Sequence, residues 1–148
     1  MREIREPNYH VDLQGEWESE PGLEENATIF RQTDGPGVLT VTLFRVRPMF
    51  AIADKRRLVE DYLSHRSTYE ASHTPAMALS EPVSWEAGGS IEGSWNGLDP
   101  VADHRLRHHV VLVEDVLADL VYEAVGLAED DFLARADEIF QTVSVIAS

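Results

Sequence analysis

The chain has 148 residues, of which 27 are acidic and 12 basic, and its formal charge is −15. A chain of this length can bury a substantial core, and 43% hydrophobic residues is typical of a globular protein, so we expect one domain spanning residues 1–148. The negative field disfavours binding to nucleic acids and to anionic membranes. No apolar run approaches the ~20 residues that span a bilayer, so no membrane insertion is expected. The absence of cysteine excludes disulfides and thiol chemistry.

Residues 1–13 bear on localisation and on the first strand, and we expect a cytoplasmic protein. Its first residues carry charges but no apolar stretch, so we expect no signal peptide. Tyr9, Val11 and Leu13 alternate with polar residues, which is typical of a half-buried strand. Residues 16–26 are acidic and contain proline and glycine, and they predict a loop.

A hairpin and a helix follow the loop. Residues 27–32 and 38–46 are rich in β-forming residues, and the Asp-Gly-Pro-Gly sequence between them predicts a tight turn. The helix is expected to begin near Asp54, as its N-cap, and to end before Pro75.

Apolar and aromatic residues recur at helical spacing along that helix and predict its buried face. They are Leu58, Val59, Tyr62, Leu63, His65 and Tyr69. We expect His65 to be half-buried and paired with Asp61, in preference to a role as a general base.

Four strands are then predicted as a meander, over residues 83–87, 91–95, 104–113 and 117–125. Two registers are open for the first pair. A three-residue loop over residues 88–90 keeps apolar residues on one face and places both tryptophans on the same side, so we prefer it to a two-residue turn.

The last element is a helix with an acidic start at residues 129–131, which suits the helix dipole. Its predicted buried stripe is Phe132, Leu133, Ala136, Ile139, Phe140 and Val143. The order of elements predicts an α+β fold with a central antiparallel sheet of about six to seven strands and two helices.

Three segments resemble the Mog1/PsbP-like family. They are the opening strand that runs into Gly15 and Trp17, the late hairpin at residues 110–124, and the closing helix that runs into residues 142–145. The resemblance implies an α/β/α sandwich. It also implies a binding, assembly or chaperone module, since the family includes a Ran-binding import factor, photosystem extrinsic subunits and bacterial secretion-effector chaperones. No shared catalytic residue is implied.

Two places carry candidate binding residues. Trp85 and Trp95, with Ile91, form either core or an apolar face that binds a protein partner. The second place is a basic segment at the start of the first helix, which could bind an anion or be neutralised by nearby acids. Its residues are Arg45, Arg47, Lys55, Arg56 and Arg57.

A histidine cluster is the only candidate metal site. His104 and His108 should share one face of a strand, with His109 on the other, so that strand supplies at most two ligands. We therefore expect no metal and a solvated strand that also carries Arg105 and Arg107. The chain has no nucleophile elbow, zincin motif, P-loop or dinucleotide fingerprint, so no cofactor is predicted.

These observations favour a non-enzymatic protein-interaction or chaperone-like module, which could form a homodimer. One alternative is a small-ligand or anion-binding protein with a pocket between the sheet and the first helix. Another is an enzyme without a recognisable motif. The acidity fits either adaptation to salt or the choice of a basic partner.

Overall fold

The computed structural model describes residues 8–146, so the start of the chain, where we expected no signal peptide, lies outside the described residues. The strands are β1 (Asn8–His10), β2 (Trp17–Pro21), β3 (Ala27–Gln32), β4 (Val38–Arg45), β5 (Ala78–Leu79), β6 (Val83–Ala87), β7 (Ser90–Asp99), β8 (His104–Val113), β9 (Val116–Val125) and β10 (Ser144–Ile146). The helices are α1 (Ile52–His73) and α2 (Glu129–Thr142).

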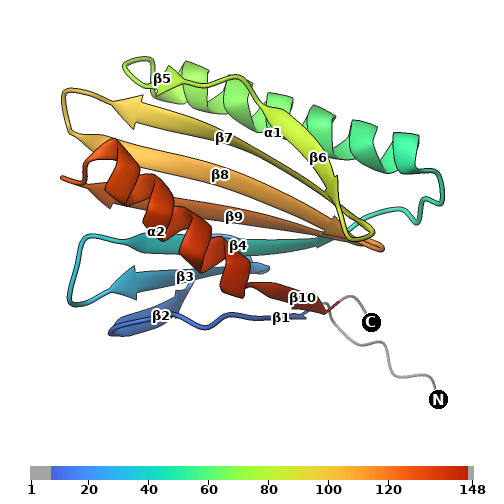
Figure 1. Cartoon of the computed structure of the whole chain (residues 1–148), viewed down its shortest axis with the longest axis horizontal. Coiled ribbons are helices and arrows are strands. Elements are labelled where there is room, and N and C mark those ends of the chain that lie inside the picture. The colour runs from blue at the N-terminus through green and yellow to red at the C-terminus, as the bar shows by residue number, and fades with distance from the viewer. Residues whose placement is uncertain (1–7, 147–148) are drawn as a thin grey trace.

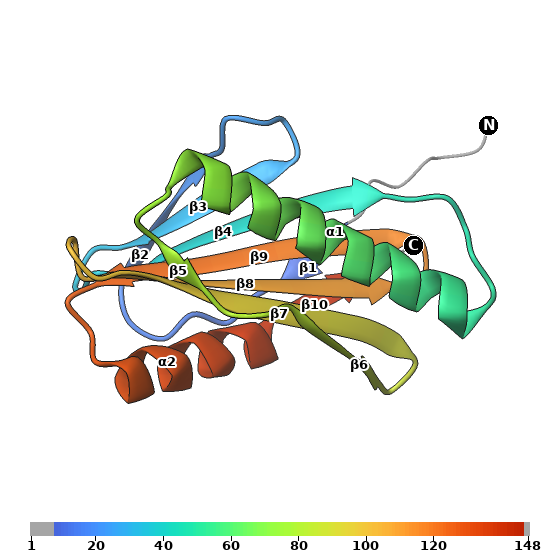
Figure 2. The ribbon, with the colours of Figure 1, turned by 90° about the horizontal axis from the view of Figure 1, so that it is seen from above.

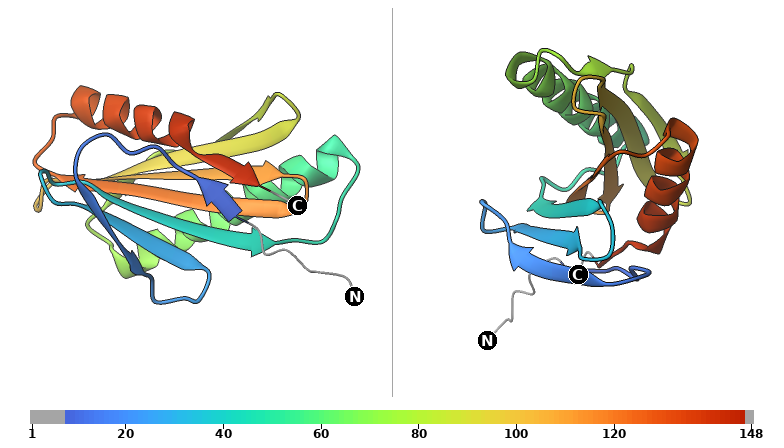
Figure 3. Two further views of the ribbon diagram at one scale, coloured as in Figure 1. Left: turned by 90° about the horizontal axis from the view of Figure 1, so that it is seen from below. Right: turned by 90° about the vertical axis from the view of Figure 1, so that its left-hand side faces the viewer.

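The centre of the fold is an antiparallel sheet of eight strands, in the order β2-β3-β4-β9-β8-β7-β5, with β6 also paired to β7 (Figure 1). Strands β1 and β10 form a separate two-stranded sheet. Helix α1 packs on β6, β7 and β8, and α2 packs on β8 and β9. The helices cover opposite faces of the sheet (Figures 2 and 3), which confirms the predicted α+β sandwich.

Each face of the sheet has its own apolar core. Beneath α2, Phe132, Ala136 and Phe140 pack on alternate residues of β4 and β9. Beneath α1, Val59 and Leu63 pack on Ile91 and Trp95 of β7 and on their neighbours in β8. The stripe predicted for the last helix therefore supplies one core, and part of the stripe predicted for the first helix supplies the other.

The exact face of α1 differs from the prediction. Its N-cap is Ala51, and Asp54 lies in the first turn with no capping role. His65 and Tyr69 are exposed, because the helix is rotated so that Val59 and Leu63 point into the sheet. The expected half-buried histidine is therefore wrong.

Gly93 explains how closely α1 approaches the sheet. A Cβ atom at this position would overlap Leu63 Cδ1 and would lie 3.0 Å from the Val83 carbonyl oxygen and 3.1 Å from Val59 Cγ1. The bare backbone of Gly93 thus provides the space that the two buried side chains of α1 occupy.

The preferred register of the β6–β7 hairpin is also wrong. Trp85 pairs with Glu92, and Ala87 pairs with Ser90, so the turn contains only Gly88 and Gly89. Both glycines have positive φ, at 55° and 91°, as a tight two-residue hairpin turn requires. The turn geometry therefore decided the register over apolar matching.

Residues 16–26 were predicted as a loop, but they contain the edge strand β2, whose acidic side chains are exposed. Glu20 in this strand forms an ion pair with Arg31 of β3, with Oε1 and Nε 2.6 Å apart. An edge strand tolerates charges and a terminal proline because one side of its backbone needs no partner. The first predicted strand is shorter than expected, although Tyr9, Val11 and Leu13 all pack against the core.

Candidate functional site

The predicted partner-binding residues do not share a surface. Trp95 and Ile91 are buried beneath α1, with exposed fractions of 2% and 0%. Trp85 is half-buried on the opposite face of the sheet, because it pairs with Glu92 and residues 92 and 95 point to opposite faces. Only Trp85 of this set is therefore accessible for contact with a partner.

The basic segment before and within α1 is partly neutralised. Arg45 Nη1 lies 2.6 Å from Asp115 Oδ2. Arg56 Nε lies 3.2 Å from Glu60 Oε1, and its guanidinium also donates to the Ser84 backbone carbonyl. Arg47 and Arg57 are exposed and Lys55 is half-buried. None of the three cavities described below is lined by these basic residues.

The three histidines of β8 lie apart and are paired with different carboxylates. Three close contacts, which are ion pairs when the histidine is protonated, join His104 to Glu123, His108 to Asp119, and His109 to Glu92. The expectation of a solvated strand is wrong for His108 and His109, whose exposed fractions are 3% and 6%. Within residues 8–146 no group of three or more potential ligands converges to hold a metal ion.

The most buried polar cluster lies between α1 and the sheet. The Tyr62 hydroxyl of α1 donates a hydrogen bond to Asp119 Oδ2 of β9. The other carboxylate oxygen of Asp119, Oδ1, lies 2.5 Å from His108 Nε2. The ring of Trp95 lies 5.1 Å from that of His108. This cluster ties α1 to the two central strands.

The charges of this cluster stabilise one another. Burial alone would raise the pKa of Asp119, but the positive charge of His108 and the hydrogen bond from Tyr62 hold it below its usual value. Burial and the charge of Asp119 raise the pKa of Tyr62 far above its usual value. Because Asp119 and His108 are enclosed by α1, the cluster resembles a structural network and not a solvent-facing acid–base pair.

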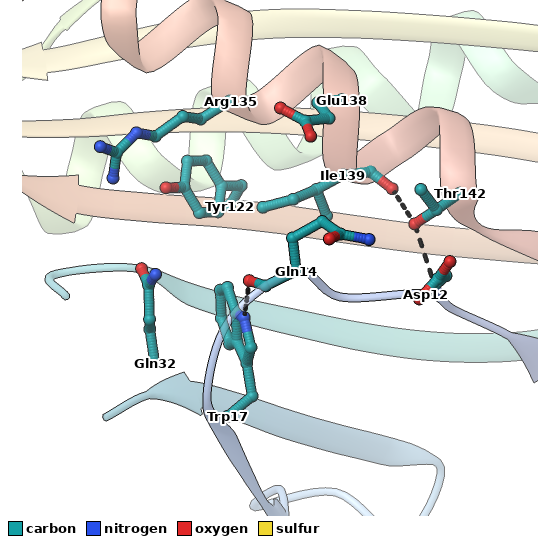
Figure 4. Close-up of a pocket in the computed structure, with 9 residues that line it drawn as sticks. All are labelled: Asp12, Gln14, Trp17, Gln32, Tyr122, Arg135, Glu138, Ile139 and Thr142. Atoms are coloured by element: carbon teal, nitrogen blue, oxygen red, sulfur yellow. Dashed lines mark hydrogen bonds between the residues drawn. The ribbon is translucent and has the colours of Figure 1, made fainter. Parts of the chain in front are cut away.

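A cavity of about 260 Å³ lies on the other face of the sheet, where α2 meets the N-terminal segment (Figure 4). Its lining comes from the segment between β1 and β2, from β2, β3 and β9, and from α2. The lining residues are Asp12, Gln14, Trp17, Gln32, Tyr122, Arg135, Glu138, Ile139 and Thr142. We call this cavity the α2 pocket.

Local contacts hold the walls of the α2 pocket in place. The Trp17 indole Nε1 donates to the Gln14 carbonyl at 2.9 Å. The Asp12 backbone N–H donates to Thr142 Oγ1 at 3.4 Å, which links the N-terminal segment to the end of α2. Tyr122 stacks on Phe132, with ring centroids 5.3 Å apart.

The α2 pocket is polar at its ends and apolar between them. Burial raises the pKa of Tyr122, and the charge and hydrogen bond of Arg135 oppose part of that rise. The phenol therefore stays neutral and can donate or accept a hydrogen bond. The Trp17 and Ile139 side chains supply apolar surface (Figure 4). Such a cavity, with a few polar groups around apolar walls, is typical of a small-molecule site.

Two further cavities have volumes of about 250 and 240 Å³. One is lined by residues of β3, β4, β8 and β9, and the other lies near the start of α2 beside β5 and β7.

Sequence reasoning missed the α2 pocket. Trp17 was noted only as part of a strand motif, Tyr122 as part of the late hairpin, and Arg135 not at all. The available signal was the tryptophan itself, since a large aromatic residue beside an acidic segment lacks an obvious local core. Nothing in the sequence links residues 17, 122 and 135, because only tertiary packing brings them together.

No family model and no curated protein sequence matches the chain. Solved structures do match it. CyanoP, the cyanobacterial PsbP of Synechocystis sp. PCC 6803, superimposes with a TM-score of 0.66 at 11% identity, over 97% of this chain and 95% of that chain. LpqN of Mycobacterium tuberculosis, described as involved in cell envelope biogenesis, has a TM-score of 0.62 at 12% identity, over 96% of this chain and 85% of that chain.

These two proteins both have Mog1/PsbP-type folds. This chain therefore has that fold, as its strand and helix pattern suggested. In the part of the chain from residue 8 to residue 146, no helix is both long and apolar enough to cross a bilayer.

Proposed function

We propose that this Mog1/PsbP-type domain is a non-enzymatic binding module whose ligand site is the α2 pocket. The observation that carries the proposal is the cavity of about 260 Å³, whose lining comes from five segments and includes one arginine, the buried Tyr122 and the ring of Trp17. A site assembled by packing of the N-terminal segment on α2 is held in shape before any ligand arrives, which reduces the ordering cost of binding.

Binding fits this site better than catalysis does. The buried Asp119 and His108 lie on the other face of the sheet and are enclosed by α1. The α2 pocket holds instead a guanidinium, carboxylates and carboxamides, which orient ligands by hydrogen bonds. LpqN is involved in cell envelope biogenesis, and a ligand-binding role in a related process is compatible with this chain.

The experiment follows the three tryptophan indole N–H signals by ¹H–¹⁵N NMR. Millimolar free amino acids, dipeptides, short carboxylic acids and hexoses serve as the panel of probes. We expect at least one probe to shift the Trp17 signal in a saturable way while the buried Trp95 signal stays fixed. Ile139→Phe should block binding by filling the pocket, whereas the matched variant Val101→Phe, at a turn residue that is 90% exposed, should not. A Trp17 signal that no probe moves would contradict the proposal.

A second candidate is protein binding along β6, by a second copy of the chain. Strand β6 pairs only with β7 among the described strands, and its Val83 is 55% exposed beside Trp85. A strand edge with an apolar side chain is a template for pairing with another strand, and here Arg56, which donates to the Ser84 carbonyl, would have to move aside. Sedimentation equilibrium tests this idea, since self-association should be present in wild type and lost in Val83→Lys. A monomer at all accessible concentrations would exclude self-pairing.

A further inference from the structure

The α2 pocket carries charges of both signs. Arg135 lies beside Tyr122 at one end, and Asp12 lies beside Thr142 at the other, with Glu138 on the wall between them (Figure 4). Within residues 8–146 none of these three charged side chains takes part in an ion pair. Arg135 lies beside the Tyr122 phenol, and its positive charge lowers the pKa of that group against the effect of burial (Figure 4). The pocket therefore offers one cationic and one anionic end to a ligand.

This arrangement disfavours ligands with a single charge. A simple anion held by Arg135 would also face two carboxylates, in a chain whose net charge is −15. A simple cation would face the guanidinium, and the described residues contain no cluster that could hold a metal ion. A molecule with a carboxylate at one end and an ammonium at the other satisfies both ends at once.

The length of the pocket sets the size of that molecule. Arg135 and Thr142 are about two helical turns apart on α2, or about 10 Å along the helix axis. A single amino acid carries its two charges too close together to reach both ends. Two residues extend about 7 Å, and the side chains of Arg135 and Asp12 can close the remaining gap.

The groups between the two ends suit a peptide bond and apolar side chains. Gln32 Oε1 accepts from the Gly37 backbone N–H at 3.3 Å, which leaves its amide N–H groups available to donate to a peptide carbonyl. The Trp17 N–H is already used by the Gln14 carbonyl, so its ring offers apolar surface. Ile139 adds to that surface.

We infer that the ligand of the α2 pocket is a free dipeptide with apolar side chains. Its carboxylate binds Arg135 and Tyr122, its ammonium binds Asp12 and Glu138, and its side chains contact Trp17. This inference rests on the proposed function, because it names the ligand class of the same site.

The test titrates four probes into the protein while the Trp17 indole signal is recorded. The probes are leucyl-leucine, its C-terminal amide, its N-acetyl derivative, and the derivative blocked at both ends. We expect leucyl-leucine to bind at least about tenfold more tightly than either singly blocked form, since each lost charge removes charge-assisted hydrogen bonds. The N-acetyl form also stands for the carboxyl end of a longer chain.

Matched variants assign each end of the ligand. Arg135→Gln should lose the preference for the free acid over the amide. The double variant Asp12→Asn/Glu138→Gln should lose the preference for the free amine over the acetylated form. Arg57→Gln, which changes an exposed arginine of α1, should keep both preferences. The Trp85 and Trp95 signals report whether each variant is folded.

Two outcomes separate this inference from the proposed function. If the doubly blocked form binds as tightly as leucyl-leucine, the dipeptide inference is overturned while the pocket remains a binding site. If neither these probes nor the wider panel moves the Trp17 signal, the proposed function fails and the inference fails with it.

Discussion

At the scale of single residues, the cluster beneath α1 is the most consequential polar feature of the fold. Asp119 is almost fully buried and receives a hydrogen bond from Tyr62 and a charge contact from His108. Removing one member of such a cluster leaves the others buried without a partner, and that cost exceeds the net gain from the intact pair.

The first prediction concerns Asp119→Asn. We expect it to lower the free energy of unfolding by about 1–3 kcal/mol, because the Tyr62 hydroxyl and the His108 ring stay buried without the carboxylate that they face. Urea unfolding measures the change. Glu20→Gln, which breaks the exposed pair with Arg31, is the matched control and should cost at most about 1 kcal/mol. Equal losses in the two variants would show that the buried cluster contributes no more to the free energy of unfolding than the exposed ion pair does.

The second prediction concerns the tyrosine of the same cluster. Tyr62→Phe removes only the hydroxyl that donates to Asp119, so we expect a loss of about 1.5–3 kcal/mol. Tyr69→Phe is the control, since Tyr69 is 46% exposed. A Tyr62→Phe protein as stable as the control would mean that this hydrogen bond contributes nothing.

The third prediction follows from the lowered pKa of Asp119. A carboxyl whose pKa is lower in the folded than in the unfolded state stabilises the fold above the unfolded pKa, about 3.9, and loses this effect as the pH falls through the folded pKa. The stability difference between wild type and Asp119→Asn should therefore be constant near pH 5 and shrink below about pH 4. Urea unfolding at several acidic pH values tests this, and a difference that grows with acidity would contradict it.

At the scale of elements, the contact between α1 and β7 is set by one missing side chain. Gly93 lies under Leu63, and a Cβ atom there would overlap its Cδ1 atom. The helix can lie this low only while position 93 has no side chain.

The fourth prediction tests that contact by a double-mutant cycle. Gly93→Ala should destabilise the fold by about 1–3 kcal/mol through overpacking, and Leu63→Ala should do so through a cavity. Leu63→Ala removes the nearest atom that the new methyl group would meet and leaves the Val83 carbonyl oxygen and Val59 Cγ1 in place. The double variant should therefore lose less than the sum of the two single losses. Additive losses would mean that the two positions do not share this space.

The elements also show what the sequence can and cannot specify. The pattern of apolar residues was sufficient for β8 and β9, because the apolar run at residues 110–113 marks a strand covered on both faces and the acidic residues at 114–115 mark the turn. It failed for β2, whose exposed acids resemble a loop although its backbone is paired. It failed for the β6–β7 register because apolar matching and the turn favoured different pairings. The two-residue turn formed by Gly88 and Gly89 fixed the pairing that the structure has.

At the scale of the whole molecule, the two helices divide the protein into two different environments. The α1 face is closed and contains the buried Asp119 and His108. Helix α2 covers the other face of the sheet, and the α2 pocket lies beside it, where the segment between β1 and β2 runs into β2. The pocket could not be predicted from sequence, since its walls come from distant segments and its charges lie at exposed positions that resemble ordinary surface.

The acidity of the whole chain bears on the same pocket. With a net charge of −15, the long-range field disfavours anions, so a ligand carboxylate must gain its affinity from local contacts with Arg135 and Tyr122. Added salt screens the long-range field more than it screens those close contacts.

The fifth prediction tests the central claim, that the α2 pocket is the binding site, by one measurement. Crystals of the protein are soaked with the probe that most strongly shifts the Trp17 signal, and the ligand density is located. We expect ligand density between Trp17, Ile139 and Arg135, and no ligand density in crystals of Ile139→Phe. Density at another site, or density that persists in Ile139→Phe, would contradict it.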